Sequence, residues 1–183
     1  MKRIIAAAVC IVMMAGLAGC GNDNNKGASS GEVARISPET LISAETASAA
    51  AGTTLTMSEE GVVQDGNMLT VTYVPDPIGS YDSVSVSIEQ FSDTLSSSQI
   101  WAEYENNRIY RTDMQKVDGI GVDCYIAYPY INIFDRGCYI RISAGSGSDD
   151  GQKNLLTTLG TPAAVALESA IPADAVERSN IIQ

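Results

Sequence analysis

The chain has 183 residues and is acidic, with 22 Asp and Glu against 11 Lys and Arg and a net charge of −11 at pH 7. It contains no histidine, which excludes Ser-His-Asp or Cys-His catalysis and metal sites built on imidazole. Nucleic-acid binding needs basic patches, so we expect no nucleic-acid partner.

The first 20 residues have the pattern of an export signal. Met1-Lys2-Arg3 is a basic start, residues 4–17 carry no charge, and small residues lead to Cys20. This pattern is typical of a signal peptide, and the apolar run is shorter than the roughly 20 residues of a spanning helix. An ordinary secretory signal that happens to contain a cysteine is the alternative interpretation.

Residues 17–20, Leu-Ala-Gly-Cys, resemble a bacterial lipobox. The resemblance implies a signal peptide at 1–19, a diacylglyceryl and palmitate anchor on Cys20, and a location on the extracytoplasmic face of the cell membrane. Two acyl chains give stable membrane attachment where one chain is marginal. Residues 21–34 are rich in Asn, Gly and Ser, so we expect 20–35 to be a lipidated flexible tether.

The remaining chain predicts one α+β domain over 36–172, followed by a loosely ordered tail over 173–183. Ser43 and Gly52 bracket a helix at 44–51, and a short strand is expected at 53–57. Alternating apolar residues predict strands at 68–74 and 83–89. A capping box at Ser96 and Gln99 predicts a helix from 97 to about 110.

Two more strand patterns contain the remaining cysteines. Residues 122–128 and 138–143 alternate in polarity and place Cys124 and Cys138 on apolar faces. Cys10 would leave with the signal peptide and Cys20 would carry the lipid. A lone pair in an exported domain favours a disulfide, so we expect a Cys124–Cys138 bridge.

A turn signal conflicts with this bridge. Asp135-Arg136-Gly137 predicts a hairpin between 130–134 and 138–143. In that meander the two cysteine strands lie two strands apart, about 10 Å, whereas bridged Cα atoms lie within about 7 Å. The disulfide is the favoured interpretation and the register stays open.

Near the C-terminus the sequence predicts two helices. The first covers 152–159 and ends at Gly160, and Thr161-Pro162 begins a second that runs to Ile171. With the elements above, this order predicts an antiparallel sheet with about three helices packed on one face.

The domain is similar to small secreted bacterial lipoproteins of unknown function and to the extracellular sensor-type domains of some receptor kinases. The residues that carry this likeness are 41–52 (LISAETASAAAG), the helix ending near Tyr110, and 117–121 (VDGIG) before a strand. The resemblance implies a PsbP-like or related α+β sandwich and a binding or sensing role.

Aromatic residues are the candidate binding surface. Tyr125 and Tyr139 lie on the strand face opposite the cysteines, where tyrosine supplies rigid amphipathic contact area; the alternative is that they pack under a helix. Trp101, the single tryptophan, is either part of a ligand site or a core anchor against the sheet, and the core role is favoured.

No residue set predicts catalysis, a cofactor or a metal. Asp113, Asp118 and Asp123 carry oxygen ligands for calcium, but their five-residue spacing matches no calcium loop. Glu103 and Glu105 are candidates for a hydrolase carboxylate pair, although carboxylates are common on any acidic surface.

We therefore expect a lipid-anchored, non-enzymatic module that binds a small ligand or another envelope protein. An accessory or structural envelope lipoprotein is the first alternative, and a carboxylate-based hydrolase is the second.

Overall fold

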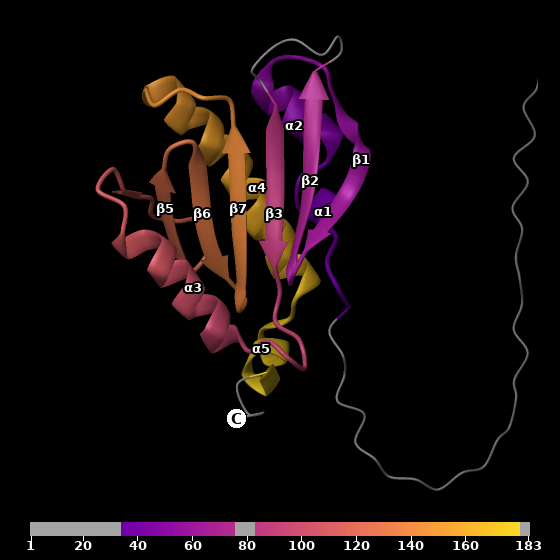
Figure 1. Ribbon diagram of the computed structural model, residues 1–183, viewed down its shortest axis with the longest axis vertical. Coiled ribbons are helices and arrows are strands. Elements are labelled where there is room, and N and C mark those ends of the chain that lie inside the picture. The colour runs from indigo at the N-terminus through magenta and orange to yellow at the C-terminus, as the bar shows by residue number, and fades with distance from the viewer. Residues whose placement is uncertain (1–33, 76–82, 180–183) are drawn as a thin grey trace, which may run out of the picture. The chain divides into compact units, whose positions relative to one another are not determined.

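The computed structural model describes residues 34–75 and 83–179 (Figure 1). The expected signal peptide, Cys20 and nearly all of the expected tether lie outside the described residues. No helix among the described residues is long and apolar enough to cross a membrane.

The described residues form a single α+β domain around one antiparallel sheet, as expected. Its seven strands follow the order β1-β2-β3-β7-β6-β5-β4. The chain thus forms two meanders, β1 to β3 and β4 to β7, which join where β3 pairs with β7. The strands are β1 (Leu55–Asp65), β2 (Met68–Pro75), β3 (Val84–Glu89), β4 (Gln115–Lys116), β5 (Asp123–Ala127), β6 (Tyr130–Asp135) and β7 (Cys138–Ala144).

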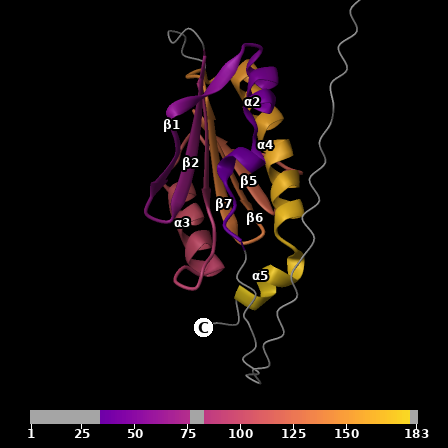
Figure 2. The same cartoon turned by 90° about the vertical axis from the view of Figure 1, so that its right-hand side faces the viewer.

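The helices cover both faces of the sheet, which corrects the expectation of helices on one face. Figure 2 shows α3 (Ser97–Ile109) on one side of the sheet, and α2 (Ala44–Ala51) and α4 (Asp150–Ala170) on the other. The short helix α1 (Pro38–Leu41) contacts α4, and the last helix, α5 (Ala173–Ser179), follows α4 in sequence. Alternate strand residues point to opposite sides of the sheet, so the two faces carry different side chains. We call the α4 side the aliphatic face and the α3 side the aromatic face.

The local signals at α2 and α3 are confirmed. The Ser43 side chain accepts a hydrogen bond from Thr46 N, and Gly52 ends α2 with φ of 69°. At α3 the Ser96 and Gln99 side chains make both halves of the capping box. β1 extends further than predicted, to Asp65, because a bulge between Met57 and Val62 lets it keep pairing with β2.

One long helix replaces the two that were predicted near the C-terminus. α4 continues through Pro162, which occupies its interior. An interior proline costs about 3 kcal/mol, but each fully buried Leu contributes about 1.5–3 kcal/mol, and Leu156, Leu159 and Leu167 are all buried on this helix. Gly160 marks close packing instead of a helix end, since its Cβ would lie 2.8 Å from Ile131 Cδ1.

The segment after α4 is also more ordered than predicted. The expected loose tail contains α5 over residues 173–179, and Ala175 on this helix is buried. Residues 180–183 of the expected tail lie outside the described residues.

The expected disulfide is not formed. β6 lies between β5 and β7, so Cys124 pairs with Ile133 and Cys138 pairs with Asp135. Both cysteines are buried free thiols, and burial raises the pKa of each thiol to about 12. The hairpin signal at Asp135-Arg136-Gly137 was the correct one, and the cysteine pairing was wrong.

Candidate functional site

A groove opens at the end of the sheet where the β6–β7 hairpin meets three helices. Figure 1 shows the start of α3, this hairpin and α5 at the same end of the domain. The groove has a volume of about 660 Å³. Its lining residues come from four places in the sequence: Ser97, Ser98 and Trp101; Gly121 and Val122; Phe134 to Gly137; and Glu168, Ala173 and Val176.

Trp101 and Phe134 form the aromatic wall of the groove. The capping box fixes the start of α3, and Trp101 follows one turn later. The Trp101 ring lies edge-on to Phe134 with centroids 4.7 Å apart, and it stacks on Tyr104 at 5.4 Å. Trp101 keeps 36% of its surface exposed. It is therefore both an anchor for α3 and an accessible part of the groove.

Two glycines, Gly121 and Gly137, allow the backbone to pack closely beside these aromatic residues. Arg136 and Gly137 have φ of 49° and 71°, the left-handed pair that a two-residue hairpin turn requires. Gly137 also lies directly against Ser97, where any side chain would overlap. Gly121 has φ of 60° and its Cβ would lie 2.9 Å from Ile133 Cγ2, so Val122 N can reach Phe134 O at 3.0 Å.

Asp135 is a buried polar residue at the margin of the groove. It is the last residue of β6 and is only 3% exposed. Its Oδ1 accepts a hydrogen bond from Arg136 N at 2.9 Å, whereas Oδ2 has no partner among the described residues. Burial raises the pKa of Asp135, the Arg136 hydrogen bond lowers it, and the charge of Glu168 raises it again.

Tyr125 and Tyr139 do not form a recognition surface. They are 2% and 1% exposed and lie beneath α3, where the Tyr104 ring contacts both of them at 5.2 and 5.4 Å. Tyr139 donates a hydrogen bond to Asn132 Oδ1 at 2.7 Å. The prediction of a tyrosine binding surface is wrong, and the alternative of packing under a helix is correct.

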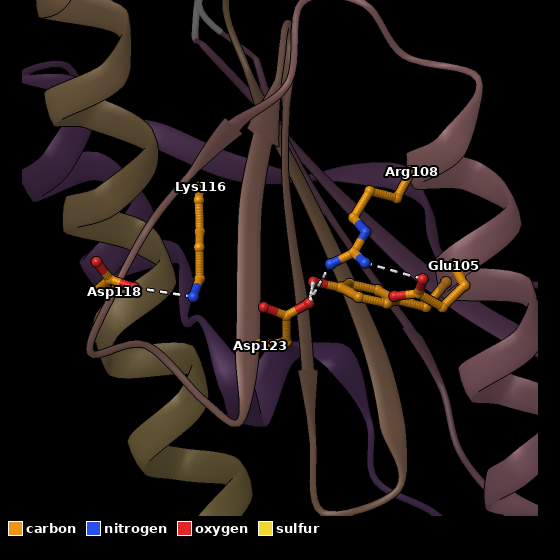
Figure 3. A network of polar contacts seen from close by, with 6 residues as sticks. Glu105, Arg108, Lys116, Asp118 and Asp123 are labelled. Carbon is orange, nitrogen blue, oxygen red and sulfur yellow. Dashed lines mark hydrogen bonds and ion pairs between the residues drawn. The ribbon is translucent and has the colours of Figure 1, made fainter.

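An ion cluster attaches the second half of α3 to β5. Arg108 lies between Glu105 and Asp123, with N···O distances of 2.9 and 2.8 Å (Figure 3). The Tyr104 hydroxyl also donates to Asp123 at 3.2 Å. One guanidinium thus holds two carboxylates, and Glu105 Oε1 is buried without a hydrogen-bond partner among the described residues. The cluster orients the helix on β5.

The aspartates that were considered for calcium are dispersed. Asp113 pairs with Arg111 at 2.9 Å, Asp118 pairs with Lys116 at 3.4 Å (Figure 3), and Asp123 belongs to the ion cluster. Among the described residues no three acidic or cysteine side chains come close enough to hold a metal ion.

A separate pair of carboxyl groups lies between β3 and α3. Glu89 is 6% exposed and its Oε2 has no hydrogen-bond partner among the described residues. Burial, followed by the charge of Glu103 and a hydrogen bond with it, raises the pKa of Glu89 to about 7. Glu89 therefore gains or loses its proton near neutral pH.

Trp101 is the groove residue that the sequence predicts as a candidate site residue; Phe134, Asp135 and Glu168 are among those that it does not. A signal for Asp135 was present, because it follows Ile131 and Ile133 at every second position and so points to the apolar face. An acidic residue in that register indicates a buried carboxylate. The turn pattern at 135–137 instead predicts a loop position for Asp135.

Comparisons with protein-family models, curated proteins and solved structures give no match for this chain. The resemblance to PsbP-like and sensor-type domains therefore stays a prediction.

Proposed function

We propose that this protein is a lipid-anchored extracytoplasmic binding module, without catalytic activity, whose domain holds a small ligand in the groove beside Trp101. The groove is the observation that carries the proposal. Its volume of about 660 Å³ falls within the roughly 300–1,000 Å³ of small-molecule sites. It also has their usual composition, an apolar wall with few polar groups.

The two alternatives have less support. An accessory envelope protein would be favoured by a flat tyrosine surface, but Tyr125 and Tyr139 are buried. A glycoside hydrolase needs two carboxyl groups about 5–9 Å apart across the substrate. Glu89 and Glu103 instead touch each other, and neither lines the groove. Of the two carboxyl groups that do line it, Asp135 and Glu168, Asp135 is only 3% exposed and so is closed to a substrate.

The anchor rests on the Leu-Ala-Gly-Cys sequence at 17–20. Intact mass of the membrane-extracted protein tests it. We expect loss of residues 1–19 and an added diacylglyceryl group on Cys20. An unmodified mature chain would contradict the membrane anchor and leave the proposal of a secreted binding protein.

Binding in the groove can be tested with Nile red, an uncharged dye whose emission rises in apolar sites. The full chain with Cys20→Ser, which cannot be acylated, keeps the dye out of attached lipid. We expect saturable binding that Trp101→Ala weakens by about tenfold, because this change removes the main aromatic contact.

Tyr110→Ala is the matched control, since Tyr110 is 81% exposed at the end of the same helix and does not line the groove. It should leave dye binding unchanged. Absence of binding, or equal loss in both variants, would contradict the proposal.

A further inference from the structure

The chain enters the domain beside the groove. Gln90, the first residue after β3, is buried; its Nε2 donates to Ala34 O at 3.1 Å and its Oε1 accepts from Ile36 N at 2.8 Å. The next residue, Phe91, lies against the groove, because its Cδ1 is 3.3 Å from where a Cβ on Gly137 would stand. Figure 1 shows the start of the described chain (indigo), the β6–β7 hairpin and α5 in the lower half of the domain. The first described residues are therefore held at the groove end of the sheet.

This entry point decides which end of the domain lies closest to the membrane when Cys20 carries lipid. The composition of residues 21–34 predicts a flexible tether, and a flexible chain of that length has a mean span of about 20 Å. The eight-residue strand β2 alone spans about 25 Å. To turn its far end to the bilayer, the domain would have to hold its groove end farther away than the mean span of the tether. The groove end is thus the end that meets the bilayer more often.

The groove end also exposes apolar side chains. Trp101 is 36% exposed and Val122 is 74% exposed, and both line the groove. Tryptophan is enriched at membrane–water interfaces because its ring is apolar and its N–H is polar. Phe134 and Val176 continue the apolar surface along the groove. This surface suits an apolar chain that arrives from the bilayer.

The charged groups of the groove indicate that it does not select a ligand by charge. Glu168 is exposed and Arg136 is half-buried, and their opposite charges offset each other. Asp135 is 3% exposed and is closed to a ligand. A charged head group therefore gains little over a zwitterionic one, and burial of an apolar chain should supply most of the affinity.

We infer that the groove binds one acyl chain of a membrane lipid, drawn from the bilayer that the groove end faces. The chain packs against Trp101 and Phe134, and the head group stays at the mouth of the groove. This inference rests on the proposed function, on both its groove and its anchor, and names the class and the source of the ligand. Chain length is the property to vary, because each buried methylene strengthens binding by about fourfold.

Single-chain amphiphiles test the class of ligand. The exported chain, residues 20–183 with Cys20→Ser, lacks both the apolar signal sequence and the attached lipid, either of which would itself bind amphiphiles. Octyl-, decyl- and dodecylphosphocholine, each below its micelle concentration, are followed by calorimetry and by the fluorescence of Trp101, the only tryptophan in the chain. Affinity should rise about tenfold for every two methylenes added. Decyl sulfate and decyltrimethylammonium should bind within about fivefold of decylphosphocholine, as expected where head-group charge is screened and offset.

Two exposed valines provide a matched pair of variants. Val122→Asp places a charge at the mouth of the groove and should weaken decylphosphocholine binding by about tenfold, because the apolar chain would lie against a carboxylate. Val165→Asp makes the same change at a position on α4 that is 58% exposed and does not line the groove, so it should leave binding unchanged. Urea midpoints verify that both variants are folded. Equal loss in the two variants, or no loss in either, would contradict the inference.

Fluorescence quenching tests the source of the chain. The lipidated protein is reconstituted in phosphatidylcholine vesicles whose acyl chains carry bromine, which quenches tryptophan at contact. We expect Trp101 to be quenched relative to vesicles without bromine, Val122→Asp to lose this quenching and Val165→Asp to keep it. If decylphosphocholine binds but Trp101 is not quenched in the vesicles, the groove takes dissolved amphiphiles and the membrane source is wrong.

The outcomes separate this inference from the proposed function. If affinity follows head-group charge and not chain length, or if no phosphocholine binds while Nile red does, the acyl-chain inference is wrong and the proposed ligand groove stands. If Nile red and every amphiphile fail to bind, both proposals fall.

Discussion

The two faces of the sheet are packed through different kinds of interaction. On the aliphatic face, Ile131, Ile133, Ile140 and Ile142 are fully buried. The helix α4 covers this face mainly with Leu156, Leu159 and Leu167, and one buried hydrogen bond joins Gln152 at its start to Ala144 O. On the aromatic face, α3 packs through rings that also carry hydroxyl groups, and charged residues surround them. The stability of the first face depends on how much apolar area is buried. The stability of the second also depends on whether each buried polar atom has a hydrogen-bond partner.

This difference explains why the groove lies where it does. Apolar contact can seal a surface without directional constraints, whereas a buried polar layer is stable only if its members are satisfied. At the tip of the β6–β7 hairpin the two faces meet, and both Trp101 from the aromatic side and Asp135 from the aliphatic side reach the same opening. Asp135 is the residue of the aliphatic face whose carboxylate is incompletely satisfied.

The largest expected effect on stability comes from truncating a buried side chain of the aliphatic face. Ile133→Ala removes a side chain with 0% exposure, so the lost burial and the remaining cavity should lower the free energy of unfolding by about 2–5 kcal/mol. Urea unfolding measures this change. Val165→Ala, on the same side but 58% exposed on α4, should change stability by less than about 0.5 kcal/mol; equal effects of the two would contradict the assignment of the core.

The aromatic face should respond to pH. Because the pKa of Glu89 is raised from 4.5 to about 7 in the folded state, the folded state binds the proton more tightly than the unfolded state, and stability falls as pH rises from about 4.5 to 7. Glu89→Gln removes this penalty. It should stabilise the protein by about 2–3 kcal/mol at pH 8 and have little effect at pH 4.

Urea midpoints at pH 4, 6 and 8 measure the change. Glu59→Gln, at an exposed position on β1, should show no such trend, and the loss caused by Ile133→Ala should stay constant over the same range. A pH-independent effect of Glu89→Gln would show that Glu89 has the same pKa in the folded and unfolded states, and would contradict the raised pKa.

A smaller effect is expected from one hydroxyl on the aromatic face. Tyr139→Phe leaves the buried Asn132 Oδ1 without its donor, which should cost about 1–2 kcal/mol. Tyr110→Phe, at an 81% exposed position, is the control for the same chemical change in solvent. Equal stability of both variants would mean that the Tyr139 hydrogen bond contributes nothing net.

Short-range signals predicted much of the fold. The caps at Ser43, Gly52 and Ser96 located two helices because each acts within one turn of chain. The alternation in residues 83–89 located β3 because burial on one face imposes a period of two. These signals need no knowledge of distant residues.

Errors arose where a local signal competed with packing between distant residues. Gly160 and Pro162 have the local pattern of a helix break, but α4 is continuous and packs closely against Ile131 at Gly160. The cysteine count favoured a bridge, but β6 separates the two thiols. The groove was beyond prediction because Trp101, Asp135 and Glu168 come together only through the tertiary fold.

The most direct test of the central claim, that ligand binds at the hairpin end, is amide chemical-shift mapping. Uniformly ¹⁵N-labelled protein would be titrated with 4-phenylbutanol, an uncharged ligand with one aromatic ring. The account predicts that the largest shifts cluster at Trp101, Val122, Asp135 to Gly137 and Glu168. Shifts centred instead on the half-buried Ser and Thr pairs of β2 and β3, such as Thr70 with Ser87, or no shifts at the highest ligand concentration, would contradict it.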